Sequence, residues 1–270
     1  MKKIASVLLT IFIYTTVNAQ TMPTASKPFV LGETEIIKSK VLNEQRTLNV
    51  YLPDGYNKDK TISYPVIYLL DGSADEDFVH IVGIVQFLTM IEAMPKTIII
   101  GIANVDRERD FTFPTSIDSD RIAYPTTGHS EKFISFLEHE LQPYVNAHYR
   151  TNGHKTIIGQ SLGGLVTTQI LIEKPWLFDD YMIVSPSLWW DHESMLQKAA
   201  QAIPGIQNNI RIYLSLGNEG DIMVGDANKL LNFMKANSKL KILYKYLPEE
   251  NHLTILHHSI YDGLEMLNKK

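Results

Sequence analysis

The segment IIGQSLGGL, residues 157–165, decides the fold of this 270-residue chain, because it places a serine between glycines directly after an apolar run. Such a run is typical of a buried strand, and residues 162–173 have the pattern of a helix that ends before Pro175. In a strand–turn–helix with the pattern G-x-S-x-G, the residues two places from the serine must be small, because strand and helix pass close together. The segment therefore predicts that Ser161 is a nucleophile on a sharp turn at the end of a strand.

Two other readings of the segment are weaker. A tight glycine turn capped by a serine gives a similar pattern, but it does not require a strand before the serine and a helix after it. A phosphate-binding loop fits less well, because the segment has neither a Gly-Lys-Ser/Thr ending nor the G-x-G-x-x-G spacing.

The segments around this turn predict an α/β fold. Residues 35–42 and 46–53 alternate in polarity and predict an antiparallel hairpin, whereas four continuous apolar runs predict strands covered on both faces: 64–70, 97–103, 156–158 and 181–185. Two alternating segments, 210–216 and 241–247, are expected nearer a sheet edge. Helices are expected at 130–149, 162–173 and from Leu253 to Leu267, while 104–128 has no clear period and is expected to be a functional loop. This order predicts a mostly parallel sheet with helices on both faces.

The N-terminal residues resemble a secretory signal peptide. Lys2 and Lys3 precede an apolar stretch, and Val17-Asn18-Ala19 has the small residues of a cleavage site. We therefore expect a signal peptide at 1–19, a flexible lead-in at 20–30 and a catalytic domain at 31–270. The protein is then periplasmic or extracellular; a retained membrane anchor is the alternative. With no cysteine, the domain must be stabilised by its core alone.

Composition excludes some partners. The net charge is −5 and the sequence has no long basic run, so neither nucleic acid nor an anionic membrane surface is an expected partner. His139-Glu140 lacks a second histidine at zinc-protease spacing, so a metal hydrolase is not expected.

A serine hydroxyl is a weak nucleophile and needs a base, which an acid must orient. In this kind of sheet the acid and then the histidine follow the serine along the chain. His252 follows the 241–247 strand and is the expected base. His257 and His258 lie further into the last helix, where a surface or packing role is expected.

The acid is expected after the 210–216 strand. Glu219 is favoured over Asp221, and Asp226 is the third candidate. Two backbone N–H groups should bind the oxyanion, one from Leu162 and one from Ser73 in the loop after the 64–70 strand. Asp71 in that loop is expected to be a structural turn residue.

The chain resembles the esterase D-like branch of the α/β hydrolases, which is related to siderophore esterases and feruloyl esterases, from about residue 35 to the C-terminus. The resemblance rests on eight segments in order: RTLNVYLPDGY, YPVIYLLDG, GIANVDRERDFTFP, FISFLEHELQPYVNAHYRT, IIGQSLGGL, SPSLWW, LGNEGD and ENHLTI. It implies an α/β-hydrolase fold without a large lid domain, a Ser161–Glu219–His252 triad, the oxyanion donors named above, and no cofactor or metal. Members vary in the acid, which leaves Glu219 and Asp221 both open.

Four further residues are candidates for substrate binding. Trp189 and Trp190 follow the 181–185 strand; one is expected to pack into the core and the other to line the pocket, with core packing of both as the alternative. Arg107 and Arg109 lie in the long loop, where ion pairs with neighbouring aspartates are expected, and Arg109 is retained as a candidate for an anionic or phenolic substrate.

The sequence thus predicts a secreted serine ester hydrolase that works through an acyl-enzyme. Siderophore, feruloyl or acetyl, and small acyl esters are all open as substrates. An acyltransferase would use the same residues, and a catalytically silent binding module is the alternative from another class of protein. The sequence does not indicate an oligomeric state.

Overall fold

The computed structural model describes residues 25–269. The chain divides into two parts, up to Val30 and from Leu31 onwards. In the first part, residues 25–30 are exposed and have no regular secondary structure. The predicted signal peptide and residues 20–24 of the predicted lead-in lie outside the described residues. Within 25–269, no helix has the length and apolar character needed to span a bilayer.

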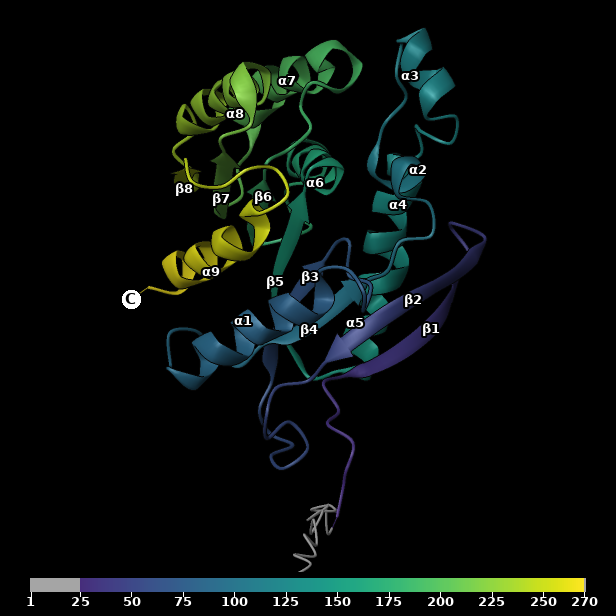
Figure 1. The fold of residues 1–270 in the computed structure, drawn as a ribbon, viewed down its shortest axis with the longest axis vertical. Coiled ribbons are helices and arrows are strands. Elements are labelled where there is room, and N and C mark those ends of the chain that lie inside the picture. Colours follow the sequence, from purple (N-terminus) through teal and green to yellow (C-terminus); the bar gives the residue numbers. More distant parts are fainter. Residues whose placement is uncertain (1–24, 270) are drawn as a thin grey trace, which may run out of the picture. The chain divides into compact units, whose positions relative to one another are not determined.

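The second part is built on a sheet in which residues 31–269 contribute eight strands (Figure 1). The strand order is β1-β2-β4-β3-β5-β6-β7-β8. The β1–β2 and β2–β4 pairs are antiparallel and all the others are parallel. The strands are β1 (Glu33–Ser39), β2 (Glu44–Tyr51), β3 (Tyr64–Leu69), β4 (Ile98–Ile102), β5 (Thr151–Gln160), β6 (Asp180–Val184), β7 (Ile210–Gly217) and β8 (Leu240–Leu247). The predicted mostly parallel sheet with an N-terminal hairpin is confirmed.

Helices cover both faces of the sheet, as the sequence predicted (Figure 1). On one face, α1 (Phe78–Met90) and α9 (Ile255–Asn268) bury their apolar residues against the sheet. The other face is covered by α2 (Arg107–Phe111), α4 (Ser130–Phe136), α5 (Gln142–His148), α6 (Leu162–Glu173), α7 (Trp190–Ala202) and α8 (Gly220–Lys235). The short helix α3 (Asp118–Ala123) buries no residue.

Two segments differ from the predicted elements. The helix expected at 130–149 is divided by a π-helical turn, η1 (Leu137–Leu141), directly before α5. Pro143 lies in the first turn of α5, and a proline inside a helix removes one hydrogen bond and crowds the carbonyl four residues earlier, which accounts for the wider turn. The segment 104–128, expected to be a loop, contains α2 and α3.

The parallel strands place the predicted site residues at one edge of the sheet. Because β3 and β5 to β8 run the same way, the loops that follow them meet at their shared carboxyl ends. Each of the residues predicted for the triad and the oxyanion site follows one of these strands, so they are brought to the same edge.

Candidate active site

Ser161 occupies a strained turn between β5 and α6. Its backbone angles are φ 59° and ψ −120°, which a residue with a side chain rarely adopts. A methyl group on Gly159 would lie 2.3 Å from the Gly163 carbonyl oxygen, and one on Gly164 would lie 2.9 Å from the Pro186 Cα. Gly159 is therefore needed because β5 and α6 approach so closely, which is the reason inferred from the sequence. Gly164, three places from the serine, is needed for a different reason, because α6 also approaches the β6–α7 loop.

The structure brings Ser161, His252 and Glu219 into direct contact. The Ser161 Oγ lies 3.0 Å from the His252 Nε2, and the His252 Nδ1 lies 2.6 Å from the Glu219 Oε2. With a proton on Nδ1 donated to the carboxylate, Nε2 is left as the acceptor for the serine hydroxyl. The predicted order of serine, acid and base thus gives a continuous line of hydrogen bonds.

Glu219 is buried, and its carboxylate accepts hydrogen bonds from His252 and from two further donors. Its side chain is only 3% exposed, and its Oε1 accepts hydrogen bonds from the Ser185 hydroxyl and, at 3.1 Å, from the Gly217 N–H. Burial alone would raise the pKa of Glu219, but the hydrogen bonds from His252, Ser185 and Gly217 outweigh it and hold the pKa below its usual value. The carboxylate is therefore charged when it faces His252.

Asp221 and Asp226, the other candidates for the acid, do not contact His252. Asp221 is exposed in the first turn of α8. Asp226 is buried and pairs with Lys229 at 3.1 Å. His257 and His258 contact His80 and Glu250 on the surface, in keeping with the role expected for them.

Gln160 links the turn that carries Ser161 to the loop that carries His252, which is called the histidine loop below. Its side-chain Nε2 donates to the backbone carbonyl of His252 at 2.5 Å. The backbone carbonyl of Gln160 in turn accepts from the Arg107 Nη2 at 3.4 Å. The sequence gives no signal for this role, because the residue before the serine is variable in the G-x-S-x-G pattern and its partner is 92 positions away.

Leu162 and Ser73, the residues predicted to bind the oxyanion, lie in two different segments. Leu162 begins α6 and lines a cavity together with Ser161. Ser73 lies in the β3–α1 loop, and its N–H has no acceptor among residues 25–269. Asp71 in the same loop binds the Arg107 guanidinium at 2.6 and 2.9 Å, so Arg107 joins this loop to the turn that carries the serine. The Ser73 N–H thus lies on a loop that Arg107 links to the turn carrying Ser161.

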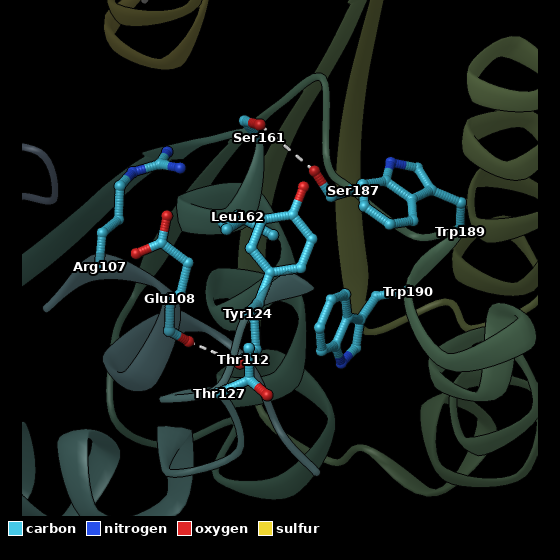
Figure 2. Close-up of a pocket in the computed structure, with 10 residues that line it drawn as sticks. All are labelled: Arg107, Glu108, Thr112, Tyr124, Thr127, Ser161, Leu162, Ser187, Trp189 and Trp190. Atoms are coloured by element: carbon cyan, nitrogen blue, oxygen red, sulfur yellow. Dashed lines mark hydrogen bonds between the residues drawn. The ribbon is translucent and has the colours of Figure 1, made fainter. Parts of the chain in front are cut away.

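A cavity of about 240 Å³ opens beside Ser161 (Figure 2). Its floor and walls mix aromatic and polar side chains: Arg107, Glu108, Thr112, Tyr124, Thr127, Ser161, Leu162, Ser187, Trp189 and Trp190. The Ser187 hydroxyl lies 3.3 Å from the Ser161 Oγ (Figure 2). The lining suits an organic group with an aromatic or apolar body and a few polar atoms.

The two tryptophans have different environments. Trp190 is 1% exposed and donates its indole N–H to the Phe113 carbonyl, whereas Trp189 is 39% exposed. Both line the cavity, and Trp190 also belongs to the core on that face of the sheet.

The structure does not place Arg109 in this cavity. Its guanidinium binds the carboxylates of Glu44, at 2.7 and 2.9 Å, and of Asp110, at 2.8 Å. Arg107, for which the sequence favoured only an ion pair, lines the cavity instead. Arg109 is therefore not supported as a substrate-binding residue, because its guanidinium is bound to Glu44 of the N-terminal hairpin. Arg107 takes its place as the candidate.

Among residues 25–269 there is no cluster of three or more histidine or carboxylate side chains suited to a metal ion.

This fold, with a serine on a strained turn between a strand and a helix, defines the protein as an α/β hydrolase. The chain belongs to the Esterase family, whose model matches residues 39–260. It is a carboxylic ester hydrolase.

Several relatives are named as esterases. The chain is similar to the ferri-bacillibactin esterase BesA of Bacillus subtilis (strain 168), with 31% identity over 71% of this chain and 72% of the relative. Among solved structures it is similar to an IroE-like serine hydrolase from Shewanella oneidensis, with 31% identity, a TM-score of 0.81, and coverage of 88% of this chain and 80% of that one. It is also similar to the BES protein from Bacillus cereus, with 26% identity, a TM-score of 0.78, and coverage of 90% and 98%.

Proposed function

We propose that this protein is an exported serine esterase in which Ser161, His252 and Glu219 form the catalytic triad. The observation that carries the proposal is the pair of contacts at the His252 ring, 3.0 Å from Nε2 to the Ser161 Oγ and 2.6 Å from Nδ1 to the Glu219 Oε2. A serine, an imidazole and a carboxylate within hydrogen-bond reach in this order are the requirements for activating a hydroxyl nucleophile.

Acylation begins when the Ser161 Oγ attacks the ester carbonyl carbon and its proton passes to the His252 Nε2. The negative charge that develops on the carbonyl oxygen is stabilised by the N–H groups of Leu162 and Ser73. As the tetrahedral intermediate collapses, the bond to the alcohol oxygen breaks and His252 gives its proton to the departing alcohol. An acyl group is left on Ser161.

Deacylation repeats these steps with water. His252 takes a proton from the water molecule, the resulting hydroxide attacks the acyl carbon, and the proton returns to the Ser161 Oγ as the acid leaves. Glu219 stays ionised throughout and stabilises the imidazolium, which its hydrogen bonds from Ser185 and Gly217 favour. An alcohol that replaces water at this stage would make the same residues an acyltransferase.

The decisive experiment replaces Ser161 by alanine. Hydrolysis of p-nitrophenyl acetate by Ser161→Ala should fall by about 10³-fold or more with an unchanged melting temperature, and labelling by a fluorophosphonate should be lost. Ser238→Ala, which removes an exposed serine outside the cavity, is the matched control. Undiminished turnover by Ser161→Ala would exclude the scheme.

The relatives suggest which esters to try. BesA is named for its ester, ferri-bacillibactin. Another relative is named an endo-1,4-beta-xylanase/feruloyl esterase; it comes from Xylanibacter ruminicola and is 25% identical over 75% of this chain and 30% of the relative. We propose an ester whose acyl group is aromatic, because Tyr124, Trp189 and Trp190 line the cavity beside Ser161. Comparing kcat/KM for a catechol siderophore lactone, methyl ferulate and an acetylated xylan tests this. A preference for the acetyl ester alone would contradict it.

Export is part of the same proposal and rests on the first 19 residues of the sequence. Determining the N-terminus of the protein secreted by its natural host tests it. We expect a mature chain that begins at Gln20, and an uncleaved chain that stays in the cell would contradict export.

A further inference from the structure

A second cavity lies on the histidine side of the site. It has a volume of about 420 Å³ and is lined by Trp189, Asn218, Glu219, Met223, Asn251 and His252. The first cavity contains Ser161 and Leu162 but not His252, and Trp189 is the lining residue that the two cavities share. In Figure 2 the Trp189 indole lies on the Ser187 side of the first cavity, apart from Tyr124 and Arg107. The side chain of Trp189, which is 39% exposed, therefore lies beside both cavities.

The chemistry of an ester assigns one half of the substrate to each cavity. The acyl carbon becomes bonded to the Ser161 Oγ while its oxygen accepts from the Leu162 N–H, and both residues line the first cavity. The alcohol oxygen must receive its proton from the His252 Nε2, so the alcohol has to depart on the side where His252 lies. His252 is a lining residue of the second cavity.

We propose that the second cavity binds the alcohol half of the ester, and that the alcohol is bulky and uncharged. This inference rests on the proposed function. The volume is enough for a group of several carbon atoms, since pockets for small organic ligands begin at roughly 300 Å³. A substrate with both halves large would then lie across the Trp189 indole with its ester bond over Ser161.

The lining defines the chemical class of the alcohol. Trp189 and Met223 offer an aromatic face and a flexible thioether for an apolar body. Among residues 25–269, neither the Asn218 carboxamide nor the Asn251 Nδ2 has a hydrogen-bond partner, so both are open to amide or hydroxyl groups. The lining contains no lysine or arginine, and the Glu219 carboxylate is 3% exposed and already bonded to His252. A charged alcohol would find no opposite charge there.

Two esters separate the cavities in an experiment. 2-Benzamidoethyl acetate has the smallest common acyl group and a bulky, uncharged, amide-bearing alcohol, whereas methyl cinnamate has a bulky acyl group and the smallest alcohol. The rate constant to measure is kcat/KM, by proton release at constant pH. It reports acylation, the step in which the alcohol is still bound.

Met223→Trp fills the second cavity and Thr127→Trp fills the first. We expect Met223→Trp to lower kcat/KM at least tenfold for 2-benzamidoethyl acetate and to leave methyl cinnamate within twofold, with Thr127→Trp showing the reverse. Equal effects of Met223→Trp on both esters, or no effect on either, would overturn the assignment. A melting temperature of each variant equal to that of the wild type shows that the fold is intact.

A second variant covers the case in which Met223→Trp does not fold. Asn218→Ala should remove the preference for 2-benzamidoethyl acetate over 4-phenylbutyl acetate, which has a similar length but no amide. A preference that survives this change would also overturn the assignment. The proposed function fails separately, because a wild-type protein that hydrolyses none of these esters and does not react with the fluorophosphonate would not be a serine esterase.

Discussion

Replacing Glu219 by glutamine tests the proposed Ser161–His252–Glu219 triad, because the two side chains have almost the same volume. The Glu219 Oε1 accepts from the Gly217 N–H at 3.1 Å, and a backbone N–H can only donate. In Glu219→Gln the amide oxygen must therefore face Gly217, which directs the amide NH₂ to the position of Oε2, 2.6 Å from the His252 Nδ1. Two donors cannot face each other, so the imidazole must carry its proton on Nε2.

That tautomer points an N–H at the Ser161 hydroxyl, so the base no longer accepts the serine proton. Loss of the correct tautomer in a serine–histidine–carboxylate triad lowers kcat by about 10⁴-fold, which is about 5 kcal/mol of activation free energy at 1.36 kcal/mol per tenfold. We expect an effect of this size in kcat with little change in KM, because Glu219 is buried behind His252 and is not positioned to bind the acyl group.

The assay is p-nitrophenyl ester hydrolysis, with the rate of fluorophosphonate labelling as a substrate-independent measure of serine activation. Glu250→Gln is the matched control, because Glu250 also contacts a histidine through its carboxylate, His258, outside both cavities. A Glu219→Gln variant that keeps more than a tenth of the wild-type kcat would refute the assignment of the acid.

Three other predictions concern the turn, the histidine loop and stability. Gln160→Met should lower kcat about tenfold without changing KM or the melting temperature, because the donor to the His252 carbonyl is lost; an unchanged kcat would contradict this. The Asp180 carboxylate raises the pKa of His154, so this pair stabilises the fold fully below pH 6.5 and loses its effect as pH rises through the raised pKa. The melting temperatures of wild type and His154→Asn should thus differ more at pH 5.5 than at pH 8.5, and the opposite trend would exclude the linkage. Gly159→Ala should lower the melting temperature by several degrees, since its methyl would meet backbone at 2.3 Å, whereas Gly205→Ala, with open space around it, should not.

Local sequence was enough to predict the framework. Continuous apolar runs, an alternating hairpin around Asn43 and one G-x-S-x-G turn each reflect a physical period or a steric limit that acts within a few residues. The order of the segments then predicted that Ser161, Glu219 and His252 follow parallel strands, and the structure places all three together. Their catalytic roles stay predictions.

Some elements gave no usable local signal. Helix α1 was not predicted, because residues 78–90 are apolar on nearly every side and show little amphipathic periodicity. Helix α7 was not predicted either; it contains a kink in which Asp191, His192 and Glu193 have positive φ, so its side chains do not follow a regular helical face. Both helices depend on packing against the rest of the fold and not on a local sequence pattern.

Tertiary structure alone decided the details of the site. Sequence order could not distinguish Arg107 from Arg109, because the choice depends on Glu44, which lies in the distant hairpin and occupies the second guanidinium. The contacts of Glu219 with Ser185 and of Gln160 with His252 likewise join residues 34 and 92 positions apart. Periodicity and steric limits act over a few residues and are therefore readable in the sequence, whereas the partner of a polar side chain in a loop is fixed only when strands far apart in the chain align.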